Sequence, residues 1–164
     1  MSIPFILSIL AALCLIPILI QGAMSDVNTR TFPSSLWKSK YHLVEIAGTL
    51  VLTQYICMAA MGDMITVVTL VLVSIFLSLI FLFAGLNFGS GGDWRALIFI
   101  VWVSPAFILA TCLASLAFGF VLAIYAMIEP EDEIEPILYR TVPFAVAICC
   151  GYICAIGYAV LVNL

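Results

Sequence analysis

Charged side chains are scarce in this chain of 164 residues, which has five Lys or Arg, nine Asp or Glu and a single His. Only 9% of the residues are charged and 66% are hydrophobic, whereas soluble domains carry about 25% charged and about 45–50% apolar residues. A small soluble domain cannot bury that much apolar surface. The shortage of Lys and Arg also excludes a nucleic-acid-binding protein, which needs clustered positive charge. We therefore expect an all-α, polytopic protein in a lipid bilayer.

Apolar runs divide the chain into six expected membrane helices, because a span needs about 20 mostly apolar residues. The expected spans cover residues 3–24, 43–61, 64–87, 94–104, 106–128 and 141–162, in one transmembrane domain over residues 1–164. The long apolar stretch 96–128 is divided at Ser104 and Pro105, since proline disfavours helix in the residue before it. The first run lacks the preceding basic residues of a signal peptide and is long for one, so we expect a span there.

Basic residues indicate the orientation of these spans, because Lys and Arg are retained on the cytoplasmic side. With six crossings and the N-terminus outside, loops 25–42, 88–95 and 129–140 all face the cytoplasm. These loops contain all five basic residues: Arg30, Lys38, Lys40, Arg95 and Arg140. A single helix over 96–128 would place Arg140 outside, so the six-span arrangement is the more consistent one.

Small residues recur at every fourth position in the last two expected spans. One series is Ala106, Ala110 and Ala114, flanked by Ser115, Gly119 and Ala123, and the other is Ala147, Gly151, Ala155 and Ala159. Such series allow membrane helices to approach closely. They predict tight packing and do not indicate a function.

Two aspartates are expected at the cytoplasmic face, Asp26 at the end of the first span and Asp93 at the start of the fourth. Two spans separate them, so the chain returns to the same face. Carboxylates at membrane depth are costly and are candidates for functional groups, although each aspartate can also simply mark a helix end at the headgroups. Two facing carboxylates can share a proton, which leaves one acid and one base for activating water against a peptide carbonyl.

The residues around both aspartates resemble the motifs of the prepilin peptidase family of intramembrane aspartyl proteases. The family's first motif, Asp-x-x-x-Arg-x-x-Pro-x-x-Leu-Trp, is matched by residues 26–37, which read DVNTRTFPSSLW. Its second motif, Gly-x-Gly-Asp followed by a hydrophobic and a basic residue, is matched by residues 90–95, which read SGGDWR. Ser90 replaces the first glycine, with Gly91 and Gly92 retained. Residues 140–144, RTVPF, are also similar to a stretch of the family.

The resemblance implies a membrane aspartic endopeptidase that removes the short basic leader of pilin-like or archaellin precursors. Cleavage would occur at the cytoplasmic face of the cell membrane, just before the precursor's hydrophobic helix. Asp26 and Asp93 would form the catalytic pair, supported by the loop residues Ser90, Gly91 and Gly92. Loop 25–42 lacks the cysteine-rich methyltransferase segment of the two-activity bacterial enzymes, so only peptidase activity is expected. Trp37 and the RTVPF stretch favour the archaeal branch over the compact bacterial enzymes.

Other polar residues each have two interpretations. Arg30 and Arg95, close to the aspartates in sequence, can lower an aspartate pKa or anchor the chain to headgroups. The acidic residues of loop 129–140 form a solvated face or attract a basic leader by charge complementarity. They are Glu129, Glu131, Asp132, Glu133 and Glu135.

No metal or other cofactor is expected. The only cysteine cluster, at 149, 150 and 154, lies in an apolar span without a histidine, which makes zinc binding improbable. Two rival functions stay open. One is a small transporter or ion channel that uses intramembrane carboxylates. The other is an inactive homologue that takes part in pilus assembly.

Overall fold

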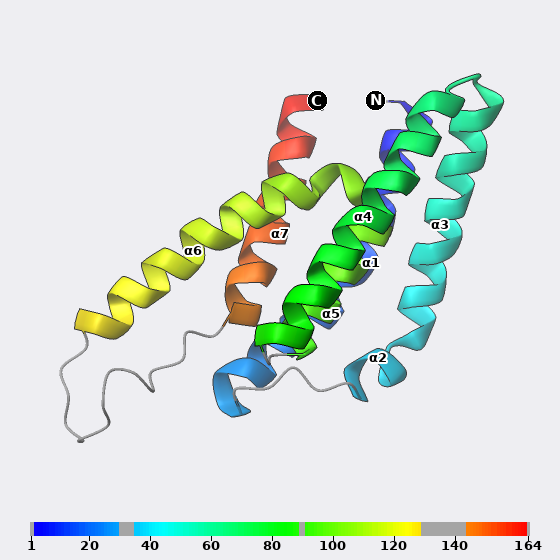
Figure 1. Ribbon diagram of the computed structural model, residues 1–164. Coiled ribbons are helices and arrows are strands. Elements are labelled where there is room, and N and C mark those ends of the chain that lie inside the picture. The colour runs from blue at the N-terminus through cyan, green and yellow to red at the C-terminus, as the bar shows by residue number, and fades with distance from the viewer. Residues whose placement is uncertain (1, 30–34, 89–90, 129–143, 164) are drawn as a thin grey trace.

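The computed structural model describes residues 2–29, 35–88, 91–128 and 144–163, and within these ranges the chain is helical, without strands. Its elements are α1 (Ile3–Thr29), α2 (Ser35–Ser39), α3 (Tyr41–Ala60), α4 (Met64–Phe88), α5 (Gly91–Val103), the 3-10 helix η1 (Pro105–Phe107), α6 (Ile108–Ile128) and α7 (Phe144–Asn163). Together they form an elongated bundle of helices (Figure 1). The expectation of an all-α polytopic membrane protein is therefore confirmed.

Five of these helices are long and apolar enough to cross a membrane, namely α1, α3, α4, α6 (with η1) and α7. The helix expected as the fourth span, α5, has 13 residues, which corresponds to about 20 Å against a hydrocarbon core of about 30 Å. The sixth crossing thus stays a prediction. The expected break at Ser104 and Pro105 is present, because η1 begins at Pro105 and separates α5 from α6.

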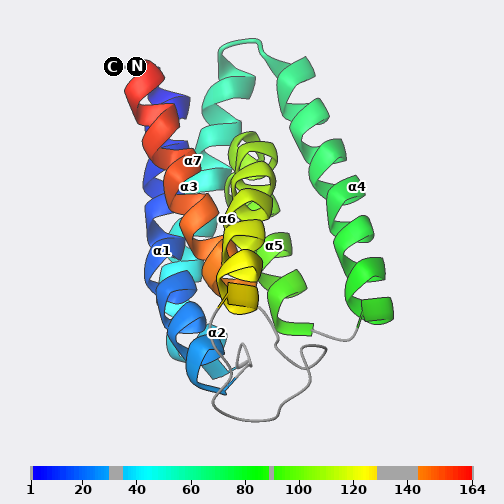
Figure 2. The same ribbon diagram turned by 90° about the vertical axis from the view of Figure 1, so that its left-hand side faces the viewer.

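The helices alternate in direction, with α1, α4 and α6 running one way and α3, α5 and α7 the other (Figures 1 and 2). One end of the bundle therefore collects the last turns of α1, α4 and α6, the first turns of α3, α5 and α7, and the short helix α2. We call it the Asp26 end, because Asp26 lies near the end of α1. The opposite end holds the turn between α3 and α4, where Gly62 adopts a positive φ of 83°.

The packed interior lies around α1, which contacts both α3 and α7, while α6 packs on α7 and α4 on α5. The buried positions Ala11, Leu15, Leu19 and Ala23 recur at helical spacing along α1. In contrast, only 6% of the most apolar window of α4 is buried, against 44% for α7. Helix α4 lies at the edge of the bundle (Figure 2), and its side chains face lipid in a membrane.

Helices α6 and α7 approach each other closely at Gly151. A Cβ at this position would lie 2.7 Å from the Ser115 nitrogen and 2.8 Å from the Thr111 carbonyl oxygen. The small-residue series on α7 therefore lies at a helix interface, as expected. Its members Ala147, Gly151 and Ala155 are all buried. The alanine series on α6 is different: Ala106 and Ala110 are exposed. The contact face of α6 contains buried Thr111 and the predicted flanking residue Ser115.

A buried hydrogen bond joins the break after α5 to α7. The hydroxyls of Ser104 and Tyr152 lie 2.7 Å apart, and both residues are fully buried. The break also keeps its backbone bonded, since the Ser104 amide donates to Ile100 and the Ser104 carbonyl accepts from the Phe107 amide. The side-chain bond fixes the short helix α5, and with it the segment that carries Asp93, against the packed interior.

Removing this bond is expected to destabilise the bundle. In a double-mutant cycle of Ser104→Ala and Tyr152→Phe, we expect a coupling energy of about 0.6–1.7 kcal/mol, the range of side-chain hydrogen bonds between membrane helices. Each single variant leaves one buried hydroxyl without its partner, so the double variant should lose less stability than the sum of the two single losses. The measurement is equilibrium unfolding in mixed micelles, and a coupling energy near zero would contradict the assigned bond.

Candidate functional site

Asp26 is a buried carboxylate near the end of α1, with 6% of its surface exposed. Its Oδ2 accepts a hydrogen bond of 3.1 Å from the backbone amide of Ala145. Ala145 is the second residue of α7, where amides have no partner inside their own helix. The carboxylate of one helix thus satisfies the free amide of another, and it faces the positive end of the α7 dipole.

Local sequence explains why the cap of α7 comes from another helix. Helices usually begin after Ser, Thr, Asp or Asn, whose side chain accepts from the second or third amide of the helix. The residues next to this start are Pro143 and Phe144, and neither side chain can accept a hydrogen bond. Because α1 packs against α7, Asp26 supplies the missing acceptor across a separation of 119 residues.

Asp93 lies in the first turn of α5, together with Gly91 and Gly92. The expectation that α5 starts at residue 94, after a glycine-rich break, is therefore corrected by three residues. An acidic residue in a first helical turn is favoured by the dipole, which is consistent with the earlier start. The side chains of residues 91–93 are outside the part of the chain that the structure describes.

The backbone places the two aspartates at one end of the molecule. Helices α1 and α5 contact each other, and the end of α1 and the beginning of α5 both lie at the Asp26 end (Figures 1 and 2). The third aspartate of the described residues, Asp63, precedes α4 at the opposite end. The expectation from sequence that Asp26 and Asp93 share a face thus agrees with the arrangement of the helices.

Basic residues of the described ranges also belong to the Asp26 end. Lys38 lies in α2, Lys40 lies between α2 and α3, and Arg95 lies in the first two turns of α5. Arg95 is exposed, and among the described residues no ion pair joins it to Asp26. For Arg95, the interpretation as a headgroup anchor fits its exposure better than a contact that tunes Asp26.

Several predicted site residues fall outside the described ranges. They are Arg30, Ser90 and the acidic residues Glu129, Glu131, Asp132, Glu133 and Glu135. Their roles stay predictions from the sequence. Within the described ranges, no group of three or more His, Cys, Asp or Glu side chains is arranged to hold a metal ion.

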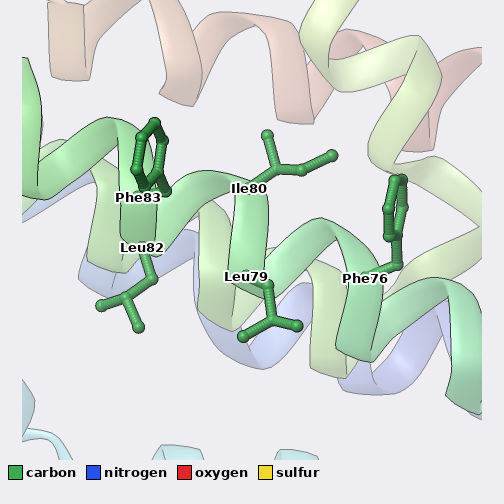
Figure 3. A pocket seen from close by; sticks show the side chains of 5 residues that line it. All are labelled: Phe76, Leu79, Ile80, Leu82 and Phe83. Atoms are coloured by element: carbon green, nitrogen blue, oxygen red, sulfur yellow. The ribbon is translucent and has the colours of Figure 1, made fainter.

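Two surface hollows among the described residues are lined by other side chains than the aspartates. One, of about 530 Å³, is lined by five apolar side chains of α4. Figure 3 shows that Phe76, Ile80 and Phe83 project to one side of this helix and Leu79 and Leu82 to the other. These side chains are well exposed and carry no polar atom, so they fit contact with lipid acyl chains rather than chemistry.

A smaller hollow of about 320 Å³ lies near the beginning of α3 and includes His42 and Glu45. Both side chains are exposed and one helical turn apart. This arrangement fits a polar anchor at the membrane interface. The buried carboxylate of Asp26 with its defined partner is consequently the strongest site candidate among the described side chains.

The sequence did not identify Ala145 as part of this site. Its contribution is a backbone amide, which any residue except proline carries, so no residue type marks it. The sequence held only an indirect signal. The start of α7 has no side chain next to it that could cap the helix, and an aspartate near the end of another helix could supply the acceptor. Comparison of the chain with protein-family models, with curated proteins and with solved structures gave no match.

Proposed function

We propose that the chain is a membrane aspartic endopeptidase that removes the short basic leader of pilin-like or archaellin precursors. One observation carries the proposal: the helix segments that contain Asp26 and Asp93 lie at the same end of the bundle, on helices that contact each other. In this function, one carboxylate accepts a proton from the attacking water while the other donates a proton to the leaving amine. The proton shared by such a pair belongs to the dyad rather than to one residue.

The proposed orientation places the Asp26 end in the cytoplasm and the N-terminus outside. It is supported by Lys38, Lys40 and Arg95 at this end, because basic residues remain on the cytoplasmic side. Helix α5 is then a short fourth crossing of six, which fits its direction opposite to both α4 and α6 (Figure 1). The site thereby faces the compartment in which precursor leaders are exposed before export from the cell membrane.

Cleavage of a precursor by the isolated chain tests the function. The full chain is purified, reconstituted in lipid and mixed with a pilin-like precursor that carries a basic leader and a C-terminal epitope. We expect a single new N-terminus directly before the hydrophobic segment, identified by mass spectrometry, and no cleavage in vesicles without the chain. A precursor with the basic residues of its leader replaced is the matched substrate control and should be cut more slowly.

The result that would overturn the proposal is an intact basic-leader precursor after incubation with the folded chain. An ion or solute flux across the same vesicles, without cleavage, would support the transporter instead. Cleavage at many positions would argue against a leader peptidase. The assay therefore separates the proposed peptidase from both rival functions.

A further inference from the structure

The contact between Asp26 and α7 has a meaning beyond capping if Asp26 is catalytic. A carboxylate has two oxygens, and only Oδ2 accepts from the Ala145 amide. The bond joins two residues on different helices. Both residues are buried, because Asp26 is 6% exposed and Ala145 is 2% exposed. A side chain held in this way cannot rotate freely, and its second oxygen, Oδ1, keeps a fixed direction.

We propose that the first turn of α7 is a positioning element of the catalytic centre, in which the Ala145 amide holds Asp26 for reaction with water. This inference rests on the proposed peptidase function. Catalytic groups gain rate when they are fixed near the reacting geometry, and small displacements cost about a hundredfold. The Ala145 amide donates to Asp26, so its effect on the reaction passes through Asp26.

The position of Ala145 allows the amide to be removed selectively. Proline has no backbone donor and is tolerated in the first turn of a helix, where the amide has no intrahelical partner. Ala145→Pro therefore deletes the bond to Asp26 and keeps the intrahelical hydrogen bonds of α7, while it disfavours the helical conformation of Phe144 alone. Ala145→Gly is the matched control, because it removes the methyl group and retains the amide.

In the precursor assay we expect Ala145→Pro to lower kcat about ten- to a hundredfold. The KM should stay within about twofold of the wild-type value, because the positioning of Asp26 does not bind the leader. Ala145→Gly should retain most of the activity. Equal kcat for Ala145→Pro and wild type would overturn the inference, and so would an equal loss in both variants, because lost side-chain packing would then explain it.

Amide hydrogen exchange tests the bond without any reliance on activity. Labelling phenylalanine with carbonyl ¹³C and alanine with ¹⁵N selects the two Phe-Ala pairs of the sequence, 83–84 and 144–145. The Ala145 amide should be protected in the wild-type chain and in Asp26→Asn, which keeps a side-chain oxygen. It should exchange rapidly in Asp26→Ala, while Ala84 inside α4 stays protected and reports intact folding.

The two measurements separate the possible failures. Unchanged protection of Ala145 in Asp26→Ala would overturn the inference even if the precursor is cleaved. Cleavage with a normal rate by Ala145→Pro would overturn it as well and leave the peptidase function standing. No cleavage by the folded wild-type chain would overturn the proposed function, and the positioning role with it. If Ala145→Pro does not fold, the exchange measurement on the Asp26 variants decides.

Discussion

A pilin-like precursor stays uncut when Asp26 or Asp93 is replaced by Asn, with processing about 10²- to 10⁴-fold slower than in the wild-type chain, the usual contribution of a general acid or base. The dyad needs one proton acceptor and one proton donor, and an amide side chain is neither. Asn keeps the size of Asp and an oxygen that can accept the Ala145 amide, so Asp26→Asn should remain folded. The measurement is the initial rate of leader removal.

Asp63→Asn is the matched control for this result. Asp63 is exposed at the opposite end of the bundle, where its Oδ1 accepts from the Thr66 amide at 3.4 Å near the start of α4. Asn caps helices about as well as Asp, so both stability and processing should be unchanged. Normal processing by Asp26→Asn or by Asp93→Asn would refute the dyad, and slow processing by Asp63→Asn would indicate a general effect of charge.

Gly151→Ala is expected to produce the largest loss of stability among conservative changes in the membrane-embedded part. The added Cβ would meet backbone atoms of Ser115 and Thr111 at 2.7 and 2.8 Å, and it would contact the Ser115 side-chain oxygen as well. Backbone cannot turn aside as a flexible side chain does, so α6 and α7 must separate. Overpacking of this kind costs about 1–3 kcal/mol, to be measured by unfolding in mixed micelles.

Gly157→Ala provides a control on the same helix with the opposite expected sign. Nothing lies within 4 Å of a Cβ at Gly157, and the residue is exposed. Replacing an exposed helical glycine by alanine is neutral or stabilises by up to about 1 kcal/mol. Equal stability of the two variants would show that α6 and α7 do not approach as closely at Gly151 as described.

The sequence predicted the helices well, because apolar run length is a strong signal in a chain with so few charges. Their ends were less predictable. Helix α1 continues to Thr29 although polar residues begin near Ser25, since a helix can extend beyond the hydrocarbon core into the headgroup layer. The start of α5 at Gly91 was missed because glycines usually indicate a break, whereas the first turn of a helix tolerates them.

The sequence predicted which end of the bundle contains the candidate site, because the number of spans determines the direction of the chain. Counting spans placed Asp26 and Asp93 at one end, and the arrangement of α1 and α5 agrees. The partner of Asp26 was not predictable, because a contact over 119 residues with a backbone amide depends on how α1 packs against α7. On α6, spacing alone did not distinguish exposed Ala110 from buried Thr111. The predicted flanking residue Ser115 does lie at the contact with α7.

The long separation between Asp26 and Ala145 has a consequence for biogenesis. Ribosomes add about 5–20 residues per second, so the 119 residues between the two partners take about 6–24 seconds to synthesise. During this time the carboxylate depends on water and headgroups for hydrogen bonds. If the proposed peptidase function holds, Asp26 therefore lacks its α7 partner, and the site stays incomplete, until residue 145 has been synthesised.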